Sequence, residues 1–251
     1  MCTSIILFRK SHIWPVIIGT NRDENLERIS KFPQRHWLKK YPHIIAGKDE
    51  EKKGSWIGIN DYGLVAIIHN RVLNENVTNK TTSRGHIILD VLNHSNMENA
   101  LQYIVNFDRF NYNNFNLLIA NYNECYWIKH NLNNKELLTQ KLEEGLSIMT
   151  YKDLNDKNDK KINFYYQLFS SLEVPNPSID NWVFWKQSLT NYNSNNLNDN
   201  NKICFADYQN NFGTKSSSLI AIPNIKKTKE KLIFKSTNSF PINNQYIDVM
   251  Y

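Results

Sequence analysis

Two neighbouring segments decide how this chain folds: MCTSIILF at residues 1–8 and IIGTNRDENLERIS at residues 17–30. Both begin with runs of apolar and β-branched residues, which predict β-strands at 2–8 and 16–22. The stretch 9–15 between them is polar at most positions and predicts a turn. We therefore expect the two segments to pair as an antiparallel hairpin.

The register of this hairpin determines which polar side chains meet. With its centre near Ser11 and His12, the numbers of paired residues sum to about 24, because pairing in a hairpin is set by the turn. Directly opposed side chains on one face lie about 5 Å apart. One face would then carry Cys2, Ser4, Thr20 and Arg22, and Asn21 and Asp23 would flank Arg22.

Cys2 is a candidate nucleophile because it can become the first residue of the mature chain. Initiator methionine is usually removed before a small residue, which would leave a thiol and a free α-amine on Cys2. That amine has an ordinary pKa near 8 and could serve as a general base. Arg22 beside the thiol would favour the thiolate, and Asp23 could hold a guanidinium or an ammonium group. The alternative is a buried structural cysteine next to a surface ion pair.

A second hairpin is predicted further along the chain. Strands at 55–60 and 64–69 flank the turn Asp61-Tyr62-Gly63, and Asn70 follows the second strand. Acyl transfer needs hydrogen-bond donors for the developing oxyanion. The amide of Asn70 could be such a donor, and a turn residue is the alternative.

The remaining pattern predicts helices and strands in blocks. Helices are expected at 83–93, 97–107, 160–172 and 178–192, strands at 115–121, 125–130, 146–151, 217–222 and 232–235, and a mobile low-complexity loop at 193–201. This order lacks the alternation of a parallel α/β sheet. We expect an α+β fold of two antiparallel sheets with helix pairs outside them, in a single domain over residues 1–251.

Composition excludes several classes of protein. The net charge of +6 comes from 30 basic and 24 acidic residues that are mixed along the chain, which argues against a nucleic-acid site. No apolar run approaches the roughly 18 residues of a membrane span. Three widely spaced cysteines argue against a disulfide framework, and the histidines show no metal-ligand spacing. We expect a cytoplasmic protein, or one of an organelle matrix, without integral membrane association; the sequence does not indicate its oligomeric state.

Several short motifs are spread over most of the chain: Met1-Cys2, Asn21-Arg22-Asp23-Glu24, Arg28-Ile29-Ser30, Gly54-Ser55-Trp56-Ile57-Gly58, Ser83-Arg84-Gly85, Phe115-Asn116-Leu117 and Phe212-Gly213-Thr214-Lys215. In these motifs the chain resembles the NRDE family, the transport-and-Golgi-organisation proteins. That family is similar to N-terminal-nucleophile (Ntn) amidases of the bile-salt hydrolase and penicillin V acylase type. The resemblance implies a four-layer αββα fold.

The same resemblance implies roles for individual residues. Cys2 would be nucleophile and base, Asp23 would hold the amine, and Asn70 would contribute to the oxyanion hole. The chain departs from the amidase pattern at Thr20, where those enzymes have an arginine that Arg22 would have to replace. It departs again at Tyr151, where they have an asparagine, and relatives in the NRDE family commonly have arginine where this chain has Lys215.

Two functions are compatible with this pattern. One is a cysteine-nucleophile amidase or acyltransferase without a cofactor, acting on a small acyl or amide substrate. The other is a carrier or chaperone for haem or a lipid or acyl-CoA-like ligand, in which His69 or Cys2 could bind haem iron. Candidate substrate-binding residues are Asn21, Trp56, His69 and Lys215. For Trp56 a place in the core is the alternative, and for His69 a hydrogen bond to the backbone.

Overall fold

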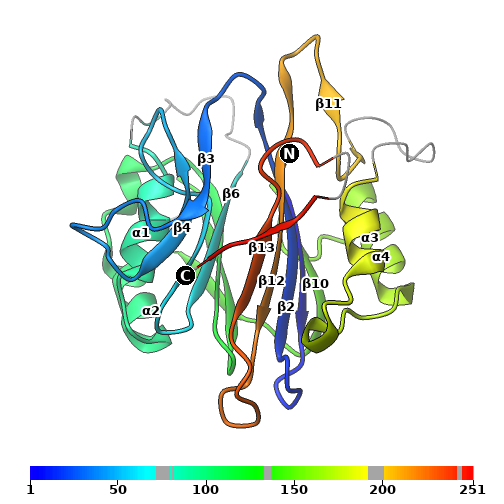
Figure 1. Cartoon of the computed structure of the whole chain (residues 1–251). Coiled ribbons are helices and arrows are strands. Elements are labelled where there is room, and N and C mark those ends of the chain that lie inside the picture. The colour runs from blue at the N-terminus through cyan, green and yellow to red at the C-terminus, as the bar shows by residue number, and fades with distance from the viewer. Residues whose placement is uncertain (72–79, 81, 133–136, 192–200, 242–244, 251) are drawn as a thin grey trace. The chain divides into compact units, whose positions relative to one another are not determined.

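The computed structural model describes residues 1–71, 80, 82–132, 137–191, 201–241 and 245–250. The chain forms two compact units (Figure 1). Met1–Glu27 and Glu143–Val249 make up the first unit, and Arg28–Leu142 makes up most of the second.

The first unit contains an antiparallel sheet. Its strands are β1 (Thr3–Phe8), β2 (Val16–Asn25), β10 (Gly145–Met149), β11 (Ala206–Asp207), β12 (Phe212–Ile222), β13 (Ile233–Ser236) and β14 (Ile247–Asp248). Within the described residues their order is β10-β1-β2-β12-β13-β14, and β11 pairs with β12. The long strand β12 lies beside β2 over its whole length, so the sequence-distant C-terminal part of the chain supports the N-terminal hairpin (Figure 1).

The predicted register of the first hairpin is confirmed. Phe8 pairs with Val16 and Ser4 with Thr20, so the paired numbers sum to 24. The hydroxyl oxygens of Ser4 and Thr20 lie 2.7 Å apart. Ser4 and Thr20 of the expected polar face therefore lie together.

Two helices pack on one face of this sheet, α3 (Lys160–Ser171) and α4 (Val183–Leu189). Asp159 caps α3 by accepting a hydrogen bond from the backbone N–H of Ile162. Gly19 of β2 allows α4 to lie close, since a Cβ at this position would come within 2.7 Å of the Leu189 side chain. The core between helices and sheet includes Ile5, Ile17, Trp14, Tyr165, Trp182 and Trp185.

The helix predicted at 178–192 is interrupted. A 3-10 turn (Pro177–Ile179) is followed by Asp180 in the left-handed backbone region, with φ 54°, and α4 begins only at Val183. A left-handed residue cannot continue a right-handed helix, which explains why the prediction was too long. Most of the loop predicted at 193–201 lies outside the described residues.

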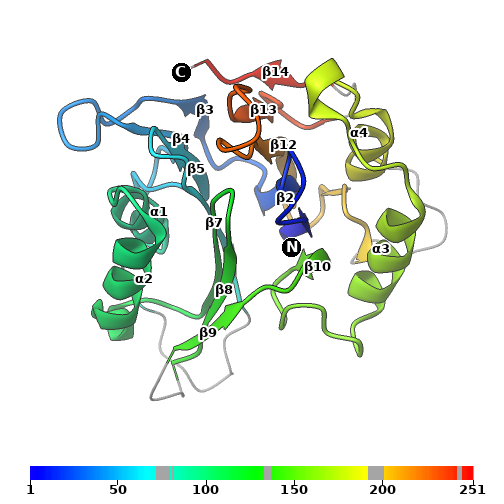
Figure 2. The same ribbon diagram turned by 90° about the horizontal axis from the view of Figure 1, so that it is seen from below.

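The second unit contains the other antiparallel sheet, with strand order β3-β4-β5-β6-β7-β8-β9 in the described part of the chain. The strands are β3 (Ser30–Gln34), β4 (Ile44–Asp49), β5 (Ile57–Asn60), β6 (Val65–Asn70), β7 (Phe115–Ala120), β8 (Cys125–His130) and β9 (Leu138–Lys141). Helices α1 (Gly85–Leu92) and α2 (Met97–Asn106) cover one face of it (Figure 2), and a 3-10 turn (Arg109–Asn111) precedes β7. Gly63 has φ +83° in the β5–β6 turn, as the Asp-x-Gly pattern predicted.

Two motif glycines bring distant backbone segments together in this unit. The Ser55 N–H donates to the Gly85 carbonyl at 2.9 Å. A Cβ on Gly54 would come within 2.5 Å of the Gly85 backbone, and one on Gly85 within 2.8 Å of the Ser55 nitrogen. The start of α1 can therefore cross the β4–β5 connection only with glycine at both positions.

The prediction of an α+β fold with two antiparallel sheets and their helix pairs is confirmed. Strands β3, β4, β9, β11 and β14 were not predicted. Two of these strands lie at the edges of their sheet and lack a regular apolar pattern: β3 contains Pro33, and every residue of β9 is exposed. β4 lies between β3 and β5 and was missed although five of its six residues are buried. No helix within the described ranges has the length and apolar character needed to cross a membrane.

Candidate active site

Cys2 lies immediately before β1, beside the end of β2 that carries the polar motif. Its sulfur accepts a hydrogen bond from the Asp23 N–H at 3.2 Å, and the thiol donates to the Asp23 carbonyl at 3.4 Å. The backbone of one motif residue therefore holds the sulfur from both sides. This contact follows from the hairpin register that the sequence predicted.

The carboxylate of Asp23 lies next to the same thiol, and its side chain is fully buried. Its Oδ2 is 2.9 Å from the α-amino group of Met1. Its Oδ1 accepts a hydrogen bond from the Thr214 hydroxyl at 2.7 Å. Thr214 is the register partner of Asp23 on β12, and its own hydroxyl accepts a hydrogen bond from the Phe205 N–H. The orientation of the carboxylate is thus fixed, and it binds the α-amino group of Met1; its contact with an amine on Cys2 stays a prediction.

The thiol of Cys2 is protonated at neutral pH in the chain that retains Met1. Its pKa is raised to about 11, first by burial and second by the Asp23 carboxylate. The Met1 ammonium, the Asp23 N–H and Arg22 lower the pKa by smaller amounts. The expected effect of Arg22 is therefore present in direction, but burial outweighs it.

Arg22 and Lys215 lie near each other at an irregularity between β2 and β12. The register shifts between Thr214 and Ser216, so Lys215 is the extra residue of a β-bulge opposite the motif. Burial lowers the pKa of Lys215, and the positive charge of Arg22 lowers it further. The Lys215 ammonium donates to the carbonyl of Leu26. Arg22 is 6 % exposed, and its guanidinium lies 3.7 Å from Glu24.

Asn21 points towards the helices of its unit. Its side-chain amide donates to the carbonyls of Leu189 at 2.7 Å and Ile203 at 2.9 Å, and the residue is buried. These bonds tie the end of α4 to β2. The contacts of Asn21 in this structure are with the protein itself, and its predicted substrate contact stays a prediction.

The order of motifs agrees with a known family. The model of the family described as Transport and Golgi organisation 2 matches residues 1–231. The chain belongs to this family. No curated protein matches it in sequence.

This family member is also similar to solved structures of amide-bond hydrolases. One is a Caenorhabditis elegans ortholog of N-acylethanolamine-hydrolyzing acid amidase, with 14% identity, a TM-score of 0.57 and coverage of 87% of this chain and 92% of that chain. Another is a mutant conjugated bile acid hydrolase from Clostridium perfringens, with 13% identity, a TM-score of 0.53 and coverage of 99% and 92%. At this identity the likeness shows the fold alone, which is that of the Ntn hydrolases.

The other predicted site residues of this family member belong to the second unit. Asn70 is exposed at the end of β6, opposite Phe115. His69 is buried in the same strand, on the face away from the helices, because it alternates with Ile68 of the helix-side core. Trp56 is half-buried, and its ring lies against Gly47. Their roles towards a substrate or haem stay predictions.

Lys161 is a site residue that the sequence argument missed. It lies in the first turn of α3, is 2 % exposed, and donates from Nζ to the Met1 carbonyl at 3.1 Å. A lysine at the start of a helix usually points into solvent. Its spacing of four residues from Tyr165 and eight from Phe169, both buried, places it on the core-facing stripe. That periodicity was the available signal.

Tyr151, where the amidases have an asparagine, follows β10 and is half-buried, with the Lys152 ammonium 5.7 Å from the centre of its ring. Within the described residues no group of three or more His, Cys, Asp or Glu side chains has the arrangement of a metal site.

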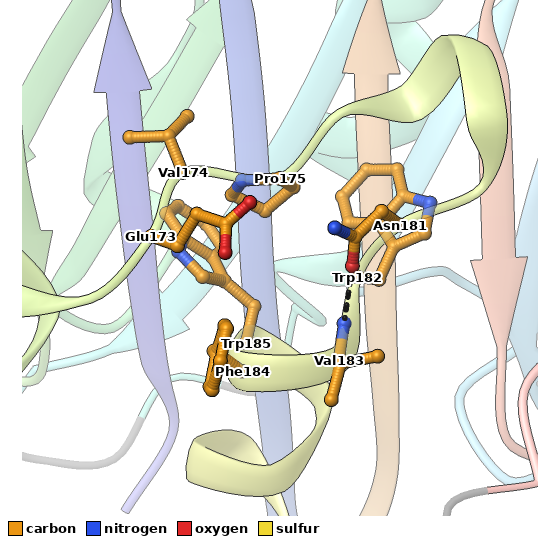
Figure 3. Close-up of a pocket in the computed structure, with 8 residues that line it drawn as sticks. All are labelled: Glu173, Val174, Pro175, Asn181, Trp182, Val183, Phe184 and Trp185. Atoms are coloured by element: carbon orange, nitrogen blue, oxygen red, sulfur yellow. Dashed lines mark hydrogen bonds between the residues drawn. The ribbon is translucent and has the colours of Figure 1, made fainter.

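A shallow pocket of about 140 Å³ lies elsewhere in the first unit, where residues 173–175 meet the start of α4 (Figure 3). The rings of Trp182 and Trp185 line it, and the Asn181 side chain accepts a hydrogen bond from the Val183 N–H. It contains no nucleophile and none of the predicted site residues. The candidate active site is therefore the Cys2–Asp23 cluster.

Proposed function

We propose that this chain is an N-terminal-cysteine amidase or acyltransferase, which acts after Met1 has been removed. The observation that carries the proposal is the pair of contacts at Asp23. Its backbone holds the Cys2 sulfur at 3.2 Å and its carboxylate holds the chain's α-amino group at 2.9 Å. Removal of Met1 would place a new α-amine on Cys2 itself, one residue from the amine that Asp23 already binds.

The reaction would proceed through a thioester. The neutral α-amine of Cys2 takes the proton of its own thiol, and the thiolate attacks the carbonyl carbon of the substrate. The tetrahedral intermediate expels the leaving amine, which takes the proton back from the α-ammonium. Water or an acceptor amine, deprotonated by the same α-amine, then attacks the thioester and restores the thiol.

The other residues would support this sequence. Arg22 offers a positive charge near the sulfur, and its effect on the Cys2 pKa is in the required direction. Thr214 fixes the carboxylate that orients the amine. The role of Asn70 as an oxyanion donor rests on the family resemblance, and its substitution by alanine would lower the rate of thioester formation about 10²-fold or more.

The proposed substrate is an amide that joins an acyl group to a small amine. The two solved structures above are titled as hydrolases of N-acylethanolamines and of conjugated bile acids. In both classes an acyl group is linked to an amine. We carry only this bond type over to the present chain.

The test begins with the intact mass of the purified full chain, which gives the fraction that lacks Met1. The protein is then incubated with fluorogenic N-acyl amides of increasing chain length, with Cys2→Ser as the inactive variant and Cys125→Ser as the matched control. We expect amine release and a transient mass increase equal to one acyl group in the wild type and in Cys125→Ser only. Full retention of Met1, or equal rates in Cys2→Ser, would refute the proposal.

A further inference from the structure

A buried cation lies next to the peptide bond that joins Met1 to Cys2. The Lys161 ammonium is 2 % exposed and donates to the Met1 carbonyl oxygen at 3.1 Å. Lysine is rarely buried to this degree without a specific partner. Here one partner is the carbonyl of the residue that the proposed function requires to be removed.

Loss of Met1 would leave this cation facing the new N-terminus. The Met1 oxygen and the Cys2 nitrogen belong to one planar peptide group, so Nζ lies within about 5.5 Å of that nitrogen. Once Met1 is gone, the nitrogen becomes an amine that can take up a proton. Two positive charges at this distance in a buried site repel each other, which disfavours the protonated amine.

The charges around Lys161 come from three elements. Burial is the largest effect and lowers the pKa of Lys161, while Asp23 of β2, the Cys2 sulfur and Asp159, which caps α3, oppose it. Asp159 is itself paired with the Lys152 ammonium at 3.3 Å. Lys161 is thus the cation that faces both Asp23 and the N-terminus from the helix side.

The Asp23 carboxylate creates a conflict that a cation in this position would resolve. A carboxylate that orients an amine also stabilises its protonated form and raises its pKa above the ordinary value of about 8. A protonated amine cannot accept the thiol proton. An opposing positive charge lets the carboxylate hold the amine while the amine stays neutral.

We propose that Lys161 is a positioning residue that keeps the Cys2 α-amine unprotonated at neutral pH by offsetting the charge of Asp23. This inference rests on the proposed function, because it requires the chain without Met1. It assigns to α3 an electrostatic role in addition to its packing role. The pKa of the general base, the Cys2 α-amine, would then depend on two neighbouring charges of opposite sign, those of Asp23 and Lys161.

The experiment measures the pKa of the α-amine directly, without a substrate. The full chain carrying Cys2→Ser removes the competing thiol and keeps a small second residue, so that Met1 can still be cleaved; intact mass verifies the cleavage. Trace acetylation with acetic anhydride from pH 5 to 10, followed by mass spectrometry of the N-terminal peptide, gives the amine's titration curve. The same curve is recorded for three double variants, in which Cys2→Ser is combined with Lys161→Met, Lys161→Gln or Lys161→Arg.

We expect the pKa of the α-amine to rise by about one pH unit in Lys161→Met and Lys161→Gln, and to stay within about 0.3 units in Lys161→Arg, which keeps the charge. Lys235→Met is the matched control, since Lys235 is another buried lysine of the first unit and pairs with Asp248 and Asp180. It should leave the α-amine pKa unchanged.

An unchanged or lower α-amine pKa in both neutral variants would overturn the inference, provided that thermal unfolding shows them folded. Both neutral variants remove a buried charge. Because there are two of them, the test still gives a result if one fails to fold. Failure of the proposed function is distinguished separately. Retention of Met1 is seen by intact mass, and an inert thiol is seen in the amide assay, whereas this measurement reports only the charge balance at the amine.

Discussion

Asp23 in the first unit and Asp49 in the second are both buried carboxylates that bind a positively charged group. The two groups differ in kind. Asp49 holds the Arg28 side chain through two hydrogen bonds, from Nε at 2.6 Å and from a terminal nitrogen at 3.1 Å. Asp23 holds the α-amino group of Met1, whose side chain is 46 % exposed. The partner of Asp49 is a side chain, whereas the partner of Asp23 is the α-amine of Met1, the residue that the proposed function requires to be removed.

The two carboxylates therefore differ in what they fix: Asp49 fixes a side chain, and Asp23 fixes a terminal amine. A bidentate arginine–carboxylate pair fixes geometry and contributes to stability. A carboxylate that holds a terminal amine fixes the position of a titratable group beside a thiol. Residues 21–30 therefore contain Arg28, whose side chain binds the buried carboxylate of Asp49, and Asp23, whose own carboxylate has the catalytic role that we propose.

The largest effect is expected from Asp23→Asn. The neutral amide keeps the shape but no longer orients the α-amine through a charged contact, so thioester formation on Cys2 should fall about 10²–10⁴-fold, the usual contribution of a positioned base. Rapid mixing with an amide substrate and intact mass would measure it. The melting temperature should change less than in Asp49→Asn. A normal rate of thioester formation together with a large loss of stability in Asp23→Asn would show that Asp23 has the structural role assigned to Asp49.

A smaller effect concerns the thiol before Met1 is removed. With a Cys2 pKa of about 11, alkylation by iodoacetamide at pH 7 should be about 100-fold slower than for an unperturbed cysteine. The rate should increase about tenfold per pH unit between pH 6 and 9, because the thiolate is the reacting form.

Mass spectrometry distinguishes the N-terminal peptide that retains Met1 from the one that lacks it, so the two forms can be followed in one sample. A plateau of the Met1-retaining form below pH 9 would contradict the burial argument. Cys125 is fully buried and provides an internal reference for a thiol that should react more slowly still.

Asp49→Asn should affect stability and not chemistry. It weakens two charge-assisted hydrogen bonds from Arg28 and one from the Lys52 N–H at 2.8 Å, in a site that is largely buried. We expect a loss of about 1.5–3 kcal/mol in the free energy of unfolding, measured by urea denaturation. Thioester formation by the folded variant should equal that of the wild type. A rate loss without loss of stability would assign Asp49 to the reaction.

The smallest effect is expected from Asp61→Asn. The Arg35–Asp61 pair also has two hydrogen bonds, at 2.7 Å and 3.0 Å from the two terminal nitrogens, but both side chains reach solvent. Water screens such pairs, so the loss in the free energy of unfolding should be below about 1 kcal/mol and should shrink with added salt. A loss equal to that of Asp49→Asn would show that burial does not distinguish the two pairs.

The sequence predicted the parts of the site that depend on local pairing. A short turn and two apolar runs were sufficient to give the register that places Ser4 opposite Thr20. Strict alternation then placed Cys2 near the end of β2 that carries Arg22 and Asp23. The sequence pattern also predicted all four helices, although the last was predicted too long, at 178–192 instead of Val183–Leu189.

The remaining parts depend on contacts between residues that are distant in the chain. Asn21 donates to carbonyls 168 and 182 residues away, and Lys161 donates to a carbonyl 160 residues away. The local sequence pattern does not predict which carbonyls these two side chains bind. Thr214 lies in a recognised motif, but its bond to Asp23 depends on the pairing of β12 with β2, which a single sequence does not specify.

The crossing at Gly54 and Gly85 has a consequence for how such chains diverge. Each glycine leaves room for the backbone of the other segment, and there is no smaller residue to which either could change. A substitution at one position therefore has no compensating substitution at the other. The two positions form a contact that should leave no trace of correlated change between related chains, even though the two segments depend on each other completely.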